Sequence, residues 1–149
     1  MAVFKSRAPR GLTLAIAAGS LMAMASTGLT LGMGEAAGNW KHPDTGAIIS
    51  FFDCGGDLCG KITKASAAGL KDDKNPDTTK RAQPLEGLSI LDHAKKAAEG
   101  SWKGDLYNAE DGQTYAGYVT LQAADKLQLK GCALLVFCKS IVFSKVAAQ

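Results

Sequence analysis

The sequence predicts an all-β domain of roughly seven or eight short antiparallel strands, closed as a barrel or packed as a sandwich. Alternation of apolar and polar residues is the strongest signal, because it places one set of side chains on each face of a strand. In residues 126–130, for example, Leu127 and Leu129 share one face and polar residues share the other. Turn-forming residues separate the alternating segments, and four cysteines in two close pairs favour a disulfide-stapled fold.

The first predicted element is a secretory signal sequence over residues 1–36. Lys5, Arg7 and Arg10 precede an uncharged, largely apolar run over 11–34, as the charged and apolar regions of a signal do. A retained membrane anchor is the alternative, since about 20 apolar residues can span a bilayer. Glycines interrupt the run and small residues typical of cleavage sites follow, so cleavage is the favoured interpretation.

Two cleavage positions fit the rule of small residues, one after Ala25 and one after Ala36. The second is preferred because the folded domain already begins with the segment around Trp40. Residues 37–149 then form a single domain, which is long enough for its own core. We expect an exported protein, periplasmic or secreted, with no stable membrane insertion after cleavage. The sequence does not specify its oligomeric state.

The domain left after cleavage is nearly neutral. Removal of residues 1–36 leaves 14 basic and 13 acidic residues, and the formal net charge falls from +3 to +1. Domains that bind DNA or RNA usually present a strongly basic surface. No nucleic-acid partner is therefore expected.

Alternation and turn residues together predict the strands of this domain. Gly-Gly-Asp at 55–57 and the segment 108–112 supply residues that tolerate the positive φ of hairpin turns. One or two helical turns are expected over 92–100, with Gly100 as the stop. The predicted strands are 46–53, 57–64, 87–92, 101–107, 114–121, 125–131 and 138–145.

The four cysteines are predicted to form two disulfides, which persist in exported proteins. Four cysteines allow three pairings, but each close pair brackets a short segment. Local pairing, Cys54 with Cys59 and Cys132 with Cys138, is therefore favoured. A zinc site is the alternative, but the chain lacks both C-x2-C spacing and a nearby histidine pair, and no metal is expected.

The polar stretch 65–84 lacks periodicity and is predicted to be a long loop, the first place to look for a ligand site. Its candidate ligand residues are Asp73, Lys74, Asn75, Asp77 and Arg81. The alternating oxygen side chains are similar to the start of a calcium loop, but the later positions of such a loop do not fit. A structural role is favoured over a ligand site, with a turn at Asn75, aspartates as caps, and Arg81 paired with Asp73 or Asp77.

Trp102, Tyr107 and Tyr115 are the remaining candidate ligand residues, because small-molecule pockets are mostly apolar with a few polar groups. They could equally belong to the core, since a barrel of about eight strands is either filled by side chains or holds one small ligand. Several glycines on the predicted inward face either leave space inside or mark bends in the strands. These are Gly60, Gly104, Gly117 and Gly131.

No catalytic residue is predicted. The sequence contains no G-x-S-x-G elbow, no H-E-x-x-H motif and no phosphate-binding loop. If both cysteine pairs are oxidised, no thiol nucleophile remains. We therefore expect neither enzymatic activity nor a cofactor.

Spaced motifs along the domain resemble a bacterial secreted family, domain of unknown function 2147. The matching segments are Gly38-x-Trp40, Leu58-Cys-Gly-Lys-Ile62, Asp73-Lys-Asn-Pro-Asp77, Arg81, Pro84-Leu-x-Gly-Leu88, Trp102-x-Gly104, Tyr107, Asp111-Gly-x-Thr-Tyr115 and Leu127-x-Leu-x-Gly-Cys132. The resemblance implies an antiparallel lipocalin-like β-barrel of about eight strands with one long polar loop. Gly38-Asn-Trp40 is similar to the G-x-W of the first lipocalin strand. The family brings no established activity.

Two functions remain open from the sequence. The first is an exported binding module that takes a small, partly apolar molecule at the barrel mouth, with the long loop as its rim. The second is a structural or interaction protein of the cell envelope with a filled barrel. An open cavity lined by Trp102, Tyr115 and inward leucines favours the first, and a solid interior with an exposed apolar patch favours the second.

Overall fold

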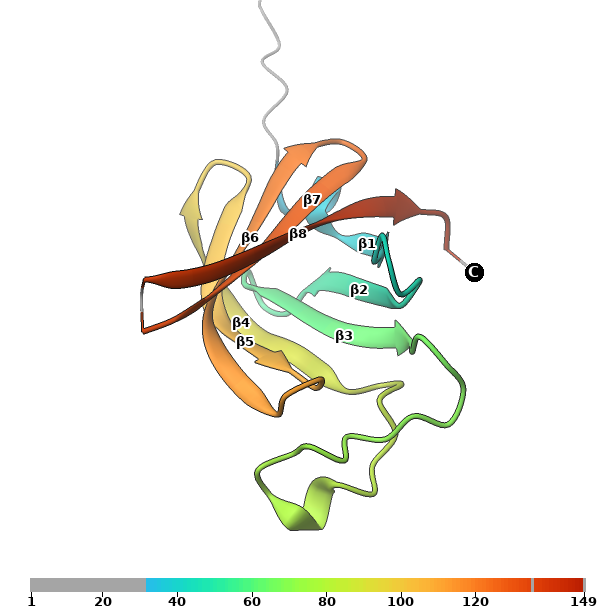
Figure 1. The fold of residues 1–149 in the computed structure, drawn as a ribbon. Helices are drawn as coiled ribbons and strands as arrows, with labels where there is room; N and C mark the ends of the chain where they lie inside the picture. The colour runs from blue at the N-terminus through green and yellow to red at the C-terminus, as the bar shows by residue number, and fades with distance from the viewer. Residues whose placement is uncertain (1–31, 135, 149) are drawn as a thin grey trace, which may run out of the picture.

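The computed structural model describes residues 32–134 and 136–148. Most of the predicted signal sequence, with the cleavage position after Ala25, lies outside the described residues. The described chain forms a closed antiparallel barrel, in which each strand pairs with the next and β1 pairs with β8 (Figure 1). The predicted barrel is therefore confirmed, and the sandwich alternative is wrong.

The barrel has eight strands. They are β1 (Gly38–Lys41), β2 (Ile48–Asp53), β3 (Leu58–Lys64), β4 (Ser89–Ala98), β5 (Ser101–Asn108), β6 (Gln113–Ala123), β7 (Lys126–Ala133) and β8 (Phe137–Val146). Because successive strands are antiparallel, their connections alternate between the two ends of the barrel. We call the end with the β1–β2, β3–β4, β5–β6 and β7–β8 connections the mouth. The opposite end, the base, carries the short helix α1 (Met33–Ala36).

Strand β4 corrects the prediction of helical turns over 92–100. Ser89–Ala98 is one strand, and Gly100 lies after it with a φ of +62°. The pairing of β4 with β5 shifts register between Asp92 and Lys95, where His93 has a φ of +46°. This β-bulge breaks the period-two alternation, so the sequence shows no strand signal there. The strands predicted from alternation do not include β1, which has only 4 residues and is too short to show alternation; the resemblance of Gly38-Asn-Trp40 to the first lipocalin strand is what indicated it.

Both predicted disulfides are confirmed. Cys54–Cys59 links the chain after β2 to β3. Cys132 and Cys138 are directly opposite each other on β7 and β8, so their disulfide closes the end of that hairpin. Formed disulfides fit an exported protein. No helix of residues 32–134 or 136–148 is long and apolar enough to cross a membrane.

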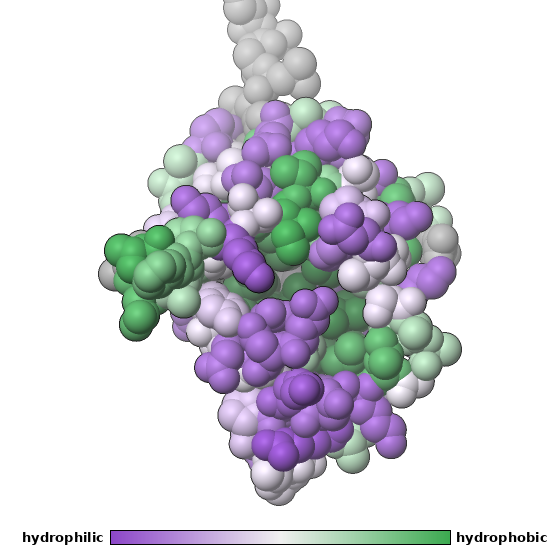
Figure 2. All heavy atoms as spheres, viewed as in Figure 1, coloured by the Kyte–Doolittle hydropathy of each residue, from purple (hydrophilic) through white to green (hydrophobic). Residues whose placement is uncertain are grey.

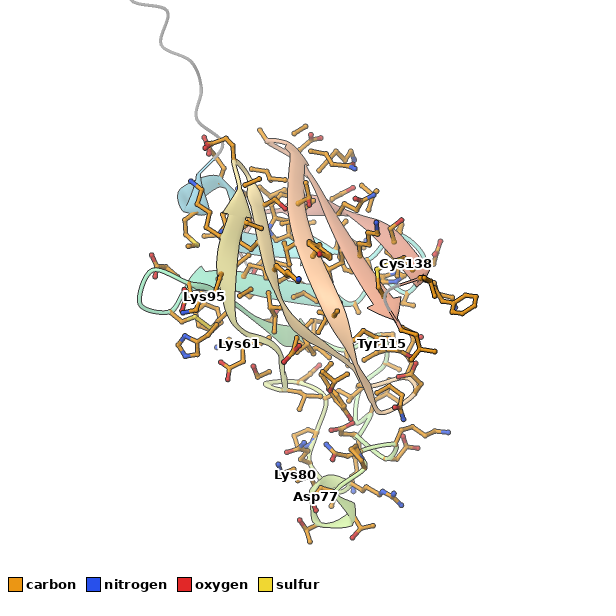
Figure 3. All side chains as sticks on the ribbon, turned by 90° about the vertical axis from the view of Figure 1, so that its left-hand side faces the viewer. Lys61, Asp77, Lys80, Lys95, Tyr115 and Cys138 are labelled. Atoms are coloured by element: carbon orange, nitrogen blue, oxygen red, sulfur yellow. A yellow bond between two sulfur atoms is a disulfide. The ribbon has the colours of Figure 1, made fainter. Side chains whose placement is uncertain are left out.

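Exposed apolar side chains gather on the β7–β8 hairpin. Its members are Leu134, Val136, Phe137, Ile141 and Val142. Figure 2 shows an apolar protrusion at the left, where Figure 1 places the β7–β8 connection. Polar residues cover the long β3–β4 loop, which extends below the barrel with Asp77 and Lys80 near its far end (Figure 3).

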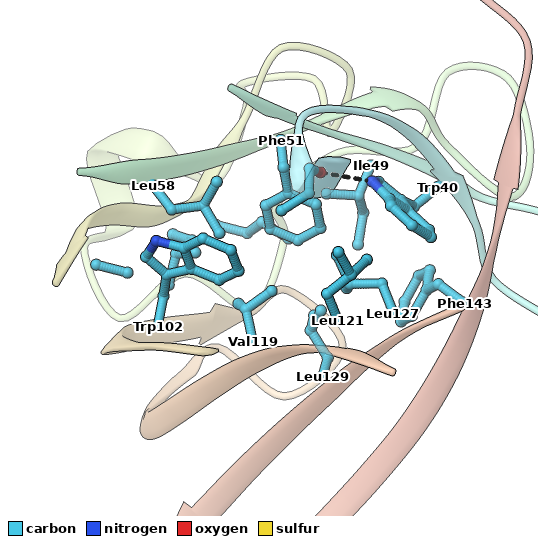
Figure 4. Close-up of a cluster of buried hydrophobic side chains, with 14 residues drawn as sticks. Trp40, Ile49, Phe51, Leu58, Trp102, Val119, Leu121, Leu127, Leu129 and Phe143 are labelled. Atoms are coloured by element: carbon cyan, nitrogen blue, oxygen red, sulfur yellow. Dashed lines mark hydrogen bonds between the residues drawn. The ribbon is translucent and has the colours of Figure 1, made fainter. Parts of the chain in front are cut away.

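Apolar side chains from every strand meet inside the barrel (Figure 4). The cluster consists of Ala36, Trp40, Ile49, Phe51, Leu58, Ile90, Leu91, Ala94, Trp102, Val119, Leu121, Leu127, Leu129 and Phe143. Ile62 and Leu106 pack against it. Leu58, Ile49 and Phe51 thus occupy the inward face, opposite the Cys54–Cys59 disulfide, as the alternation of these strands requires.

Helix α1 packs against the base of this core. Ala36 is fully buried, and its carbonyl oxygen accepts a hydrogen bond of 2.8 Å from the indole Nε1 of Trp40 (Figure 4). The Lys145 ammonium donates to the Glu35 carbonyl oxygen at 2.7 Å. These contacts span the preferred cleavage position after Ala36, which itself stays a prediction.

Candidate functional site

The long loop is organised around Asp72, which is fully buried. One carboxylate oxygen accepts the Tyr107 hydroxyl at 2.7 Å. The other accepts the side-chain amides of Asn75 at 2.6 Å and Gln83 at 3.1 Å. The Asp72 backbone N–H also donates to the Gln83 carbonyl oxygen at 3.0 Å. Asp72 therefore joins both limbs of the loop to strand β5.

This network sets the protonation state of its members. Burial raises the pKa of Asp72, but the hydrogen bonds from Asn75, Tyr107 and Gln83 outweigh it and hold that pKa below its usual range. Burial, followed by the hydrogen bond to Asp72, raises the pKa of Tyr107 to about 12. At neutral pH the Tyr107 phenol is protonated and donates to the ionised Asp72 carboxylate. This charge-assisted hydrogen bond attaches the loop to β5.

A close backbone contact fixes the loop against the β5–β6 turn. Gly112 has a φ of +70°, and a Cβ at this position would overlap the Lys74 carbonyl oxygen. Glycine is the residue that allows both the positive φ and the close approach. At the neck of the loop, Lys71 forms an isolated bridge with Pro84. The loop is thus attached at its neck and along one side.

The predicted ligand residues of the loop mostly hold the loop itself. Asn75 binds Asp72, and its side-chain oxygen accepts the Asp77 N–H at 2.9 Å. Asp77 accepts the backbone N–H and the hydroxyl of Thr79 as the cap of a short 3-10 helix, Thr78–Lys80. The predicted pairing of Arg81 with Asp73 or Asp77 is wrong.

Arg81 binds a backbone oxygen instead of a carboxylate. Its Nε donates to the Asn75 carbonyl oxygen at 2.8 Å, and Asp77 forms its ion pair with Lys80 at 3.8 Å. Asp73 and Lys74 are exposed. The loop residues therefore do not converge on a common ligand position, and the favoured structural role describes their contacts better.

A groove lies at the mouth, between the start of β6 and the end of β7. Its volume is about 450 Å³, and its lining is Gln113, Thr114, Tyr115, Ala116, Cys132, Ala133 and Leu134. Tyr115 is the one predicted ligand residue in this lining. Its hydroxyl donates to Asp111 at 2.6 Å, and that hydrogen bond raises the Tyr115 pKa. Figure 3 shows Tyr115 and Cys138 on the same side of the barrel, above the long loop.

A second depression of about 360 Å³ lies on the outer face of β6 and β7. It is lined by Ala116, Tyr118, Thr120, Gln128, Lys130, Cys132 and Cys138. These residues alternate along both strands, so the depression is outside the barrel. Ala116 and Cys132 belong to both depressions.

The predicted site residues Trp102 and Tyr107 are not in the lining of the mouth groove, although Tyr107 is opposite Thr114, which is. Trp102 is 1% exposed in the core, and its indole N–H has no hydrogen-bond partner among the described residues. Tyr107 binds Asp72 in the loop network. A cavity lined jointly by Trp102 and Tyr115 is therefore not the arrangement found.

Most of the inward glycines have close neighbours. A Cβ at Gly60 would lie 2.6 Å from the Phe51 ring, one at Gly104 would lie 2.9 Å from Ala94, and one at Gly117 would lie 2.6 Å from Leu106. Gly131 is the exception, with its nearest neighbour at an ordinary 3.4 Å. The first three glycines make room for neighbouring side chains, so they leave little free space inside.

One group of potential metal ligands is present in the described part of the chain. The ligand atoms of Cys54, Cys59 and His93 lie within 4.8 Å of one another. Both sulfurs belong to a disulfide, and a metal-binding thiolate must be free. In the oxidised protein this group offers one imidazole.

Sequence reasoning missed Asp72, Gln83 and most of the groove. Asp72 stands beside the exposed Asp73, and nothing in the composition of a loop distinguishes the buried aspartate from its neighbour. The groove residues belong to two strands that are brought together by the β6–β7 pairing of Ala116 with Cys132. The alternation patterns of β6 and β7 are the signal from which this register, and therefore the groove, could have been predicted.

The comparisons with known proteins agree with the barrel. A family described as an uncharacterised protein conserved in bacteria (DUF2147) matches residues 38–145. The solved structure titled protein HP1028 from the human pathogen Helicobacter pylori, which belongs to the lipocalin family, is 20% identical. The similarity covers 75% of this chain and 83% of that one, with a TM-score of 0.67. The curated proteins gave no match.

Proposed function

The chain belongs to DUF2147, a family of uncharacterised bacterial proteins, and we propose that it is an exported, non-enzymatic protein that binds a small, partly apolar molecule at the mouth of its lipocalin-like barrel. The protein acts in the periplasm or outside the cell. Its two disulfides support that location, because they persist in oxidising compartments.

The mouth groove is the observation that carries this proposal. Its volume of about 450 Å³ lies within the range of roughly 300–1,000 Å³ that is usual for small-molecule sites. Ala116, Ala133 and Leu134 supply apolar surface, and Gln113, Thr114 and Tyr115 supply polar groups. Such a lining suits a ligand with an apolar body and at least one hydrogen-bonding group.

The packed interior supports a ligand at the mouth rather than deep in the barrel. Trp40, Trp102 and Phe51 are at most 1% exposed, and Gly60, Gly104 and Gly117 face close neighbours. Protein interiors are close-packed and tolerate few voids. A molecule of ordinary size would have to displace several core side chains to enter.

The absence of catalysis is supported by how the polar groups are used. Asp72 and Asp111 each accept a tyrosine hydroxyl, and the pKa of each carboxylate lies below its ordinary value. Carboxylates of this kind are weak bases at neutral pH. The raised pKa values of Tyr107 and Tyr115 keep both phenols protonated.

A filled-barrel interaction protein of the envelope is the second candidate. The packed core and the exposed apolar residues of the β7–β8 hairpin favour it. Such patches often mark surfaces that meet other molecules. This candidate needs no small ligand.

Native mass spectrometry of the protein purified from its own exported compartment tests the proposal. We expect an additional small mass that disappears on denaturation. Ala116→Leu should lose it, because the larger side chain fills the groove. Ala116 also lines the outer depression, so Thr120→Leu, which changes that depression alone, should retain the ligand, as should Ala98→Leu at an exposed position of β4. A ligand mass that Ala116→Leu retains contradicts the mouth site. A bare protein that forms a defined oligomer favours the second candidate.

A further inference from the structure

The connection between β7 and β8 presents large apolar side chains to solvent. We call Leu134, Val136 and Phe137 the tip; they are 85%, 72% and 73% exposed. Hairpin turns normally carry glycine, asparagine or aspartate, whereas Leu134 has a φ of +51°, which is rare for a bulky side chain. Burial, turn propensity and backbone conformation all disfavour these residues at this tip, so a role in binding accounts for them better than a role in folding.

The tip is rigidly based. The Cys132–Cys138 disulfide bridges directly opposed residues of β7 and β8, and the next pair toward the tip is Ala133 with Phe137. The apolar side chains therefore project from a cross-linked hairpin. A preorganised projection loses little conformational freedom when it binds.

The hairpin that carries the tip is cationic, and two of its four lysines, Lys130 and Lys139, lie in the half nearer the tip. Residues 126–146 contain Lys126, Lys130, Lys139 and Lys145 and no acidic residue. Lys130 and Lys139 are exposed. Because Lys130 is opposite Ser140, and Lys139 is the next residue of β8, the two lysines point to opposite faces of the hairpin. Positive charge thus flanks the apolar tip on both faces.

We propose that this tip docks the protein on a membrane surface that contains anionic lipids. Leu134, Val136 and Phe137 enter the boundary of the acyl chains, and Lys130 and Lys139 remain among the lipid headgroups. Lys139 lies two strand residues behind Phe137, or roughly 7 Å, and interfacial elements penetrate about 5–10 Å. The contact is reversible and peripheral. The contact shares Leu134 with the lining of the mouth groove, but it requires no ligand in that groove.

The charge of the hairpin selects lipid over a second copy of the chain. Two tips packed against each other would bring together two sets of lysines with no acidic residue between them. An anionic headgroup layer supplies the opposite charge, and lysines near such a surface strengthen binding. The apolar tip thus reaches the depth of the acyl chains, and the lysines behind it lie at the depth of the headgroups.

Co-sedimentation of the disulfide-intact protein with vesicles tests the docking. Vesicles of phosphatidylcholine with phosphatidylglycerol should bind the protein, and vesicles of phosphatidylcholine alone should bind it at least about tenfold less. The double variant Val136→Ser with Phe137→Ser should lose most of the binding. Phe52→Ser, at a half-exposed phenylalanine on β2, should bind as the natural protein does.

A pair of charge variants separates headgroup contact from net charge. Lys130→Glu with Lys139→Glu should abolish binding to the anionic vesicles. Lys64→Glu with Lys103→Glu, two exposed lysines on β3 and β5, changes the net charge equally and should reduce binding much less. Equal loss in both double variants would overturn docking through the hairpin.

Phe137→Trp reports insertion directly. Trp40 and Trp102 are buried, so brominated phosphatidylglycerol should quench the fluorescence of the new indole alone. Failure of the natural protein to bind anionic vesicles at low salt overturns the proposal. Vesicle-free self-association that the double serine variant abolishes overturns it in favour of a second copy. Ala116→Leu should bind vesicles normally, so failure of the mouth site is distinguishable from failure of the tip.

Discussion

Asp72 and Tyr107 connect the long loop to the barrel wall through a buried hydrogen bond of 2.7 Å. Tyr107→Phe leaves the buried carboxylate with one donor fewer, and we expect a loss of about 1–3 kcal/mol in the free energy of unfolding. Tyr115→Phe is the matched control, because it removes the same kind of bond to the exposed Asp111 and should cost less than about 1 kcal/mol. Urea denaturation of both variants measures the difference. Equal losses would mean that the Asp72 network does not stabilise the loop.

The Tyr107 contribution should depend on pH. The pKa of Asp72 is lowered on folding, so the stability it adds is present above about pH 4 and is lost as the pH falls through the folded-state pKa. The pKa of Tyr107 is raised to about 12, so its stability is present below about pH 10 and is lost as the pH rises through 12. The natural protein and Tyr107→Phe should therefore differ by a constant amount near neutrality and converge at both extremes. A difference that does not change in acid would contradict this linkage.

For individual residues, the sequence predicted the long loop over 65–84 but not its central residue, Asp72. Asn75 and Tyr107 were named as candidate ligand residues, yet both serve Asp72. Asp72 and Asp73 are identical in type and adjacent, and only the turn geometry decides which carboxylate points inward. Such geometry depends on contacts with Gln83 and Tyr107, far away in the sequence.

Among the elements, the long loop and the β5–β6 turn give a sharp test of packing. Gly112 and Gly69 have similar φ values of +70° and +76°, but a Cβ at Gly112 overlaps the Lys74 carbonyl and one at Gly69 meets nothing within 4 Å. Gly69→Ala should lose about 1 kcal/mol from its backbone conformation. Gly112→Ala should lose more, because the loop must also move. Equal losses in chemical denaturation would show that the loop is not held against this turn.

The contacts of helix α1 lead us to expect that a chain beginning after Ala25 is more stable than one beginning after Ala36. A chain that begins after Ala36 leaves the Trp40 indole without the Ala36 carbonyl, whereas a chain that begins after Ala25 keeps it. Leaving a buried donor unsatisfied costs about 1–3 kcal/mol, so the longer form should unfold at higher denaturant. The intact mass of the exported protein identifies the natural N-terminus. Equal stability of the two forms would contradict a structural role for α1.

The sequence predicted those elements whose own residues carry the signal. Strands β5, β6 and β7 alternate regularly, and the close cysteine pairs indicated their own partners. The strand predicted over 87–92 matches the start of β4 (Ser89–Ala98), but the rest of β4 was wrongly predicted as helical turns because the bulge at Asp92–Lys95 interrupts the alternation. A bulge is set by the pairing of neighbouring strands, which one strand's sequence does not specify.

At the scale of the whole molecule, side chains fill the barrel interior and the groove lies at the mouth. Gly60→Ala would place a methyl group 2.6 Å from the Phe51 ring, and overpacking of this kind costs about 1–3 kcal/mol. Gly131→Ala meets its nearest atom at 3.4 Å and should be nearly neutral. Thermal and urea unfolding of the two variants distinguish a filled interior from an open one. Equal tolerance at both glycines would show unfilled space beside Phe51.

The family resemblance and the closure of the barrel were predictable at this scale, but the filling of the interior was not. The alternation assigned Gly60, Gly104 and Gly117 to the inward face without showing what faces them. Their neighbours Phe51, Ala94 and Leu106 each lie on the adjacent strand. Whether the space beside each glycine is filled therefore depends on strand tilt and register.

Hydrogen–deuterium exchange tests the central claim, a small molecule at the mouth of a packed barrel, most directly. The exported protein would be compared before and after removal of its bound molecule by unfolding and refolding with the disulfides intact. Peptides that cover Gln113–Ala116 and Cys132–Leu134 should exchange more slowly in the loaded form, with no change around Trp102 or Leu127. Protection concentrated around Trp102, where the indole N–H has no partner among the described residues, would place the ligand inside the barrel and contradict the claim.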